Sequence, residues 1–124
     1  GIANKPQDVF TTALVRAHMC ALLTAERRSE EQSAAFTAGL LSVLDRLLEQ
    51  PLRDILPELP LSPEVNAALL EYQGISGQAL HCAISYENRV WESVVFPNLD
   101  NGAIQDIYVQ SSALAFQQQE ALLS

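Results

Sequence analysis

Apolar residues recur at helical spacing from the first tenth of the chain onward. Five of them occupy positions i, i+3, i+4, i+7 and i+11, which is the pattern of one helix face: Phe10, Ala13, Leu14, Ala17 and Ala21. Pro6 suits the first turn of such a helix, and Asp8 complements the positive end of its dipole. Further apolar residues on a second side predict that this helix packs against neighbours in two directions.

A second apolar stripe predicts a helix that begins near Ser29 and continues to about Leu47. Ser29 is interpreted as the capping residue because acidic residues follow it directly. The stripe consists of Phe36, Leu40, Val43, Leu44 and Leu47. Gly39 lies inside this helix, where glycine costs up to about 1 kcal/mol relative to alanine. We therefore expect a neighbouring helix to approach closely at Gly39.

The rest of the chain alternates short helical patterns with turn signals. The predicted elements are a short helix over 51–56, a helix capped by Ser62 that ends before Gly74, a turn over 74–77, a helix over 77–88, a helix end and loop over 91–96, a loop over 97–102, and a last helix from Ala103 that frays at 117–119. No segment has an evident partner strand. The sequence thus predicts an all-α fold, an irregular multi-helix bundle of about six helices, in a single domain over 1–124.

Composition and charge exclude several classes of protein. Seven Lys and Arg against fifteen Asp and Glu give a net charge of −8, which argues against electrostatic binding to nucleic acid or to an anionic membrane. Two cysteines are too few for a disulfide-framed secreted domain and fit a reducing compartment. The chain shows no long apolar run and no signal-peptide pattern over 1–8. We therefore expect a cytoplasmic protein that binds neither nucleic acid nor membrane, with carboxylates that mostly form solvated helix surface.

Few residues of the chain suggest catalysis or metal binding. The chain has no glycine-rich phosphate loop, no HExxH, no CxxC and no nucleophile elbow. His18, Cys20, His81 and Cys82 would offer four zinc ligands. However, adjacent side chains on a helix diverge by about 100°, and residues two apart do not share a face. We therefore expect two buried thiols and two ordinary histidines, and no metal or other cofactor.

Several segments, taken in order, resemble the C-terminal part of an HDOD domain. They are 16–20 (RAHMC), 35–45 (AFTAGLLSVLD), 59–65 (LPLSPEV) and 86–91. More narrowly, the chain resembles the HDOD domain of bacterial proteins that join it to an EAL domain. The resemblance extends from about residue 5 to residue 92, and it implies an all-helical fold distantly related to the HD phosphohydrolases.

The resemblance also bears on catalysis. HD phosphohydrolases carry Gly-Leu-Leu-His-Asp at the end of a core helix, where the adjacent His and Asp bind the metal that activates water. In this chain Ser42 and Val43 follow the Gly-Leu-Leu of 39–41. Valine has no lone pair to offer a metal, and neutral serine is a poor ligand. The resemblance therefore implies a degenerate metal position and a protein that is not an enzyme.

The function implied is a non-enzymatic signalling output or protein-interaction module. The EAL partner of such domains belongs to cyclic di-GMP signalling, so the expected partner is a protein or a neighbouring EAL domain of the same chain. Two alternatives stay open. One is a degenerate metal-dependent phosphohydrolase that uses other ligands, and the other is a small-molecule sensor with a pocket between helices.

The candidate interaction residues are Tyr86, Glu87, Trp91 and Phe96. Exposed aromatic side chains are favoured anchors at interfaces, but the simpler interpretation is that Trp91 and Tyr86 close the core, since large apolar side chains are usually buried. HDOD domains are longer than 124 residues, so we expect the front helices to be absent. An apolar surface left open by their absence favours self-association into a homo-oligomer.

Overall fold

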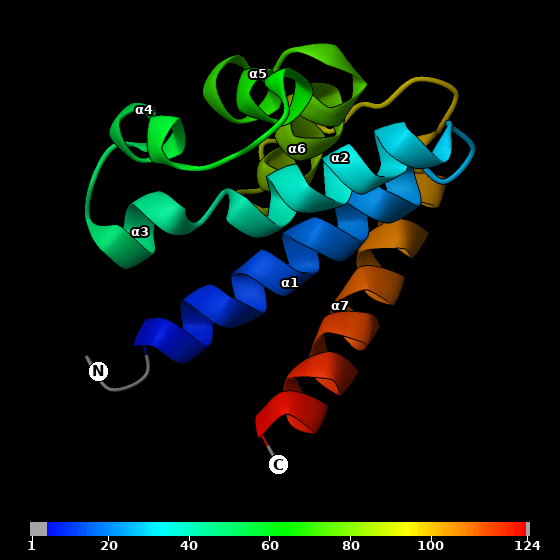
Figure 1. Ribbon diagram of the computed structural model, residues 1–124. Helices are drawn as coiled ribbons and strands as arrows, with labels where there is room; N and C mark the ends of the chain where they lie inside the picture. Colours follow the sequence, from blue (N-terminus) through cyan, green and yellow to red (C-terminus); the bar gives the residue numbers. More distant parts are fainter. Residues whose placement is uncertain (1–4, 124) are drawn as a thin grey trace.

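The computed structural model describes residues 5–123. Residues 1–4 and residue 124 of the domain predicted over 1–124 lie outside the described residues, and residues 1–4 are also part of the segment searched for a signal peptide. Within this range the regular elements are helices (Figure 1). They are α1 (Lys5–Leu23), α2 (Ser29–Leu41), α3 (Leu44–Leu48), α4 (Leu52–Ile55), the 3-10 turn η2 (Leu56–Glu58), α5 (Pro63–Glu71), α6 (Gly74–Glu87), the 3-10 turn η3 (Trp91–Ser93) and α7 (Asn101–Leu123). The β-type pairing in this range is one isolated bridge between Phe96 and Leu99. The prediction of an all-α, multi-helix fold is confirmed.

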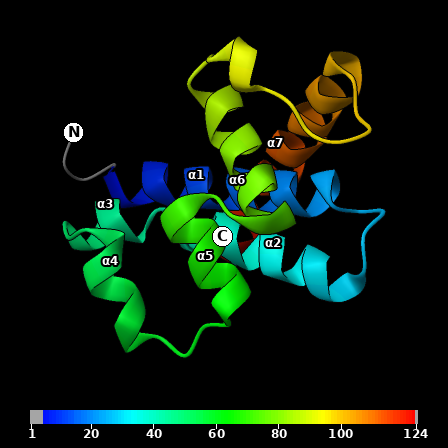
Figure 2. The same ribbon diagram turned by 90° about the horizontal axis from the view of Figure 1, so that it is seen from above.

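Helices α1 and α2 form an antiparallel pair at the centre of the molecule (Figure 1). Helices α5 and α6 lie on one side of this pair and α7 lies on the other. Seen from above, α3 lies beside the first half of α1, and α4 follows α3 on the side away from α1 (Figure 2). The two-sided packing predicted for the first helix is confirmed, because α1 contacts α2, α6 and α7.

Small residues let α1 and α2 approach closely. Ala17 on α1 and Ala35 and Ala38 on α2 are completely buried. A Cβ added at Gly39 would lie 2.6 Å from the carbonyl oxygen of Arg16. The predicted close approach at Gly39 is therefore confirmed, and its neighbour is α1.

The buried side chains fall into two clusters of unequal size. The larger cluster draws on α1, α2, α5, α6 and α7, and its fully buried large side chains include Met19, Leu56, Leu80 and Ile104. The smaller cluster has three buried members, Val9, Ala13 and Val43, with Leu40 packed against them. The bundle is thus well filled at its centre and thinly filled near the first half of α1.

The predicted helix from Ser29 to Leu47 is wrong in its length, because the chain breaks at Ser42 and Val43. Helix α2 ends at Leu41 and α3 begins at Leu44. The hydroxyl of Ser42 donates to the Gly39 carbonyl at 2.7 Å, which offers that carbonyl an alternative to the regular helical bond. The predicted cap is also displaced by one residue, since Ser29 is the first helical residue and Arg28 precedes it without a side-chain cap.

The connection between α5 and α6 differs from the prediction as well. The predicted turn over 74–77 belongs to α6, which begins at Gly74. The chain reverses instead at Tyr72, whose φ of 54° is left-handed. A Cβ at Gly77 would lie 2.1 Å from the backbone of Tyr72, so glycine at this position lets the reversal pack against the helix that follows. The cap predicted at Ser62 is confirmed, because its Oγ accepts a hydrogen bond from the Val65 amide at 3.2 Å.

The last helix is longer than predicted. It begins at Asn101 rather than at Ala103, and it runs through 117–119 to Leu123. The expected fraying is wrong because glutamine side chains bind α1: Gln118 Oε1 lies 2.8 Å from His18 Nε2, and Thr11 Oγ1 donates to Gln119 Oε1. No helix among the described residues is both long and apolar enough to cross a membrane.

Candidate functional site

A buried arginine joins three helices at the centre of the fold. The Arg16 side chain, in the middle of α1, is 8 % exposed. Its Nε donates to Oε1 of Glu87 at 3.0 Å and its Nη2 donates to Oε2 of the same carboxylate at 2.8 Å. Glu87 is the last residue of α6, and its side chain is 32 % exposed. Such a two-bond arginine–carboxylate pair is among the stronger polar contacts in proteins.

The same guanidinium also binds the break between α2 and α3. Arg16 Nη1 donates to Ser42 Oγ at 3.0 Å, and Ser42 directly follows the last residue of α2. Arg16 therefore lies beside the carboxyl ends of two helices, α2 and α6, where the helix dipoles favour a cation. We call Arg16, Ser42 and Glu87 the Arg16 cluster.

The Arg16 cluster provides a positive charge where a metal site would need negative ligands. Its one carboxylate is already bound twice by the guanidinium. Across the described residues no three His, Cys, Asp or Glu side chains come together as possible metal ligands. Small hollows of about 210 Å³ flank the cluster on two sides, one bordered by Ser42 and Tyr72 and the other by Glu87 and Tyr108.

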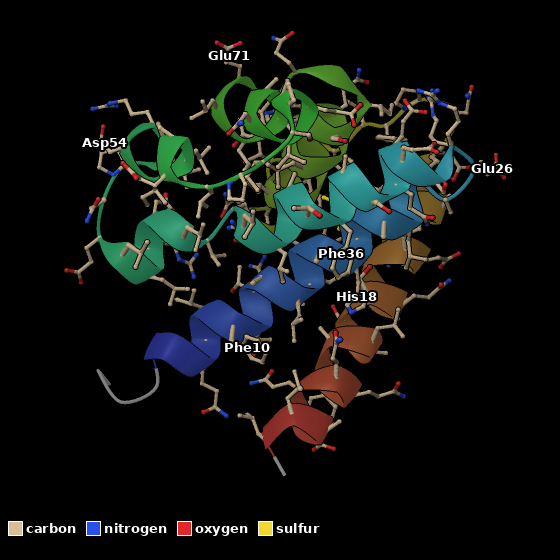
Figure 3. The ribbon with its side chains drawn as sticks, in the orientation of Figure 1. Phe10, His18, Glu26, Phe36, Asp54 and Glu71 are labelled. Atoms are coloured by element: carbon tan, nitrogen blue, oxygen red, sulfur yellow. The ribbon has the colours of Figure 1, made fainter. Side chains whose placement is uncertain are left out.

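The two histidines considered as zinc ligands have separate neighbours. His18 meets Phe36 edge-on at 5.6 Å (Figure 3), and His81 meets Tyr72 at 4.8 Å. Cys20 and Cys82 are free and buried, as the sequence predicts. Burial raises the pKa of Cys20, and it raises that of Cys82 from 9.0 to about 11. Both thiols therefore stay protonated and unreactive at neutral pH.

Most of the other carboxylates among the described residues are exposed. Glu26, Asp54 and Glu71 are exposed at the periphery of the molecule, each on a different segment (Figure 3). This arrangement fits the interpretation of the acidic residues as solvated surface.

Three aromatic side chains form a second feature next to the Arg16 cluster. Tyr86 stacks on Tyr108 of α7, with ring centroids 4.4 Å apart, and Trp91 of η3 meets Tyr86 edge-on at 5.2 Å. Trp91 is 56 % exposed, whereas Tyr86 is half-buried. A hollow of about 340 Å³ lies beside them, and Asn101 and Gln105 border it with their amides. We call Tyr86, Trp91 and Tyr108 the aromatic group.

The structure separates the four predicted interaction residues. Tyr86 and Trp91 lie together. Trp91 is exposed, so the prediction that its side chain closes the core is wrong. Phe96 is 6 % exposed and belongs to the main core. The Glu87 carboxylate is engaged by Arg16. Sequence reasoning missed the roles of Arg16 and Tyr108, because their partners lie 71 and 22 residues away along the chain and leave no local pattern.

Comparison with known proteins gives partial matches only. The chain matches no protein-family profile, and the search of solved structures found no match to it. It is 31 % identical over 93 residues to "Cyclic di-GMP phosphodiesterase CdgJ" of Vibrio cholerae serotype O1, covering 74 % of this chain and 22 % of that protein. It is 28 % identical over 110 residues to "Uncharacterized protein YuxH" of Bacillus subtilis, covering 87 % of this chain and 27 % of that protein. The chain is therefore similar to a segment that makes up about a quarter of each of these longer proteins.

Proposed function

We propose that this chain is a non-enzymatic protein-interaction module, of the HDOD type, in a bacterial cyclic di-GMP signalling protein. The similarity to the phosphodiesterase named above supports the signalling context. The matched segment is about a quarter of that relative, so its catalytic activity is not carried over to this chain. The partner we propose is an EAL domain, either in the same protein or in another.

The Arg16 cluster supports a non-enzymatic role. By resemblance, Ser42 and Val43 stand where a phosphohydrolase holds its metal ligands. Here a guanidinium nitrogen lies 3.0 Å from Ser42 Oγ, and Val43 is buried in the smaller core cluster. The guanidinium at this position already binds the Ser42 hydroxyl and both oxygens of the Glu87 carboxylate, so these oxygens are not available to hold a metal. The cluster is suited to holding helices together.

The exposed Trp91 is the observation that carries the proposal. It is the one tryptophan of the chain, it is 56 % exposed, and its ring is braced by Tyr86, which in turn stacks on Tyr108. A large aromatic side chain that is held in place but open to solvent loses little entropy on binding. Tryptophan and tyrosine are enriched among the residues that dominate binding energy at interfaces.

The single tryptophan also provides the test. The chain is titrated with a purified EAL domain, and the emission of Trp91 is expected to shift to shorter wavelength as the partner buries the ring. By calorimetry, Trp91→Ala is expected to weaken binding by about tenfold or more, since an interface anchor contributes at least about 1.4 kcal/mol. Val95→Ala is the matched control, because Val95 is also exposed, at 64 %, and lies four residues away.

Two outcomes would refute the proposal. One is an EAL domain that does not bind at all, and the other is equal binding by the Trp91→Ala and wild-type chains. A parallel titration with cyclic di-GMP alone tests the alternative that the chain is a small-molecule sensor. The ligand would then bind in the hollow beside Trp91. If the nucleotide alone shifts the Trp91 emission and the EAL domain does not, the sensor replaces the interaction module.

A further inference from the structure

The exposed Trp91 lies in a stretch of chain that has little packing of its own. Residues 88–92 follow α6 and lead into η3, and all five are exposed. The next buried side chain along the chain is Val94. Figure 2 shows this stretch leaving the end of α6 and returning toward the start of α7. Because these side chains are not packed into the core, the position of Trp91 depends on what holds the end of α6.

Backbone hydrogen bonds attach Trp91 to the last turn of α6. The Val90 amide donates to the Ser85 carbonyl at 2.9 Å, and the Arg89 amide donates to the Tyr86 carbonyl at 3.1 Å. Arg89 is left-handed, with a φ of 60°. Two such bonds around a left-handed residue form a Schellman motif, which fixes the direction in which the chain leaves a helix. Trp91 follows this motif directly, so the orientation of the last turn of α6 sets the place of its backbone.

The ring of Trp91 depends on the same turn. It meets Tyr86 edge-on at 5.2 Å, and Tyr86 stacks on Tyr108 of α7 at 4.4 Å. Tyr86 belongs to the last turn of α6 and directly precedes Glu87. Both the backbone and the side chain of Trp91 are therefore fixed relative to this one turn.

Arg16 fixes the last turn of α6 against α1. It donates two hydrogen bonds to the Glu87 carboxylate, from Nε and from Nη2. A planar guanidinium that binds both oxygens of a carboxylate restricts their relative angle as well as their distance. The pair also lies next to the aromatic group, because a hollow of about 210 Å³ is bordered by Arg16, Glu87 and Tyr108 together.

We propose that Arg16 and Glu87 are positioning residues for Trp91. Their pair fixes the last turn of α6, and this turn holds the Trp91 ring in its exposed orientation in the free chain. A ring that is already ordered loses less conformational entropy when a partner covers it. The holding of the ring is a property of the free chain, whereas its consequence for binding rests on the function proposed above.

Near-ultraviolet circular dichroism of the free chain tests the proposal. Trp91 is the one tryptophan of the chain, so its band shows how firmly this ring is held, whereas the far-ultraviolet signal reports the helices. We expect Glu87→Gln and Arg16→Met each to lower the tryptophan band by about half or more, with the far-ultraviolet signal retained. The double variant should lose no more than the larger single loss, because both changes break the same contact.

Ile55→Ala is the matched control for a general loss of stability. Ile55 is buried in α4, and α4 packs against α3, η2 and α5 rather than against the end of α6. This variant should therefore weaken the fold and leave the tryptophan band unchanged. If Glu87→Gln does not fold, Arg16→Met provides the test, since it leaves behind the more exposed of the two charges.

Calorimetric titration with the purified EAL domain gives the second measurement. We expect each folded variant of the pair to raise the dissociation constant by about twofold to tenfold, the effect of having to order one more large side chain on binding. The proposal is overturned if the tryptophan band is unchanged in both variants, if Ile55→Ala lowers it as much, or if the band falls while the dissociation constant stays at the wild-type value. If the wild-type chain does not bind the EAL domain, the proposed function fails, and the near-ultraviolet result alone decides whether the pair positions Trp91.

Discussion

Removing the charge of Glu87 should destabilise the fold more than removing the arginine that it binds. In Glu87→Gln the guanidinium of Arg16 keeps its charge but loses a carboxylate that accepts two of its hydrogen bonds, at 3.0 and 2.8 Å. The Arg16 side chain is 8 % exposed, so water can replace that partner only in part. Loss of one partner from a fully buried pair costs about 3–5 kcal/mol, and from an exposed pair about 0–1 kcal/mol.

The exposure of each partner sets where the cost falls between those limits. The Glu87 side chain is 32 % exposed, so the pair is only partly desolvated, and we expect Glu87→Gln to lower the free energy of unfolding by about 2–3 kcal/mol. In Arg16→Met the charge left behind is the Glu87 carboxylate, which water reaches. Methionine also preserves much of the buried aliphatic volume. We therefore expect Arg16→Met to cost less, about 1–2 kcal/mol.

Urea unfolding followed by far-UV circular dichroism measures both values, with a common slope if the transition stays two-state. Glu31→Gln is the matched control, because Glu31 lies 3.6 Å from an Arg28 side chain that is 78 % exposed, and such a surface pair contributes about 0–1 kcal/mol. The reasoning is refuted if Glu87→Gln costs no more than this control, or if Arg16→Met costs more than Glu87→Gln.

Three further predictions concern Gly39, Cys82 and the absence of hydrolysis. Gly39→Ala should destabilise the protein by about 1–3 kcal/mol in urea unfolding, because its Cβ would meet the Arg16 carbonyl at 2.6 Å. Gly102→Ala is the control and should be neutral or stabilising, since the nearest atom to its Cβ lies 3.5 Å away. Equal effects of the two variants would contradict the close-packing argument. Burial raises the pKa of Cys82 from 9.0 to about 11, so the thiol of the unfolded chain ionises first as the pH rises. The free energy of unfolding should therefore fall between about pH 9 and 11, and Cys82→Ala should reduce that fall. If the variant and the wild type lose stability equally at alkaline pH, this thiol is not the cause of the loss. Finally, the purified chain should not hydrolyse a generic phosphodiester with added Mn²⁺ or Mg²⁺, and turnover abolished by a chelator would restore the phosphohydrolase alternative.

Local patterns along the chain were sufficient for most of the helices. The 3.6-residue spacing of apolar residues located α1 and α2, and the Ser62–Pro63 pair located the start of α5, because caps and amphipathic stripes act over a single turn. Gly39 indicated a close helix contact before its neighbour was known, since its cost in a helix has to be offset by packing.

The break at Ser42, in contrast, was decided by tertiary structure. The apolar stripe continues through Val43 and Leu44 without interruption, so periodicity predicts one helix. What ends α2 is a serine hydroxyl bonded to the Gly39 carbonyl and held by Arg16 from another helix. Propensity is a weak preference that a contact of this kind overrides.

By itself, then, the sequence determined the all-helical class, the approximate positions of most helices and the shortage of recognisable catalytic motifs, all of which depend on neighbours a few residues apart. The tertiary structure alone decided which side chains meet and which face water. It paired Arg16 with Glu87 across 71 residues, and it buried Phe96 while leaving Trp91 exposed. These outcomes depend on how whole helices pack, because burial and pairing are properties of the assembled bundle rather than of any one segment.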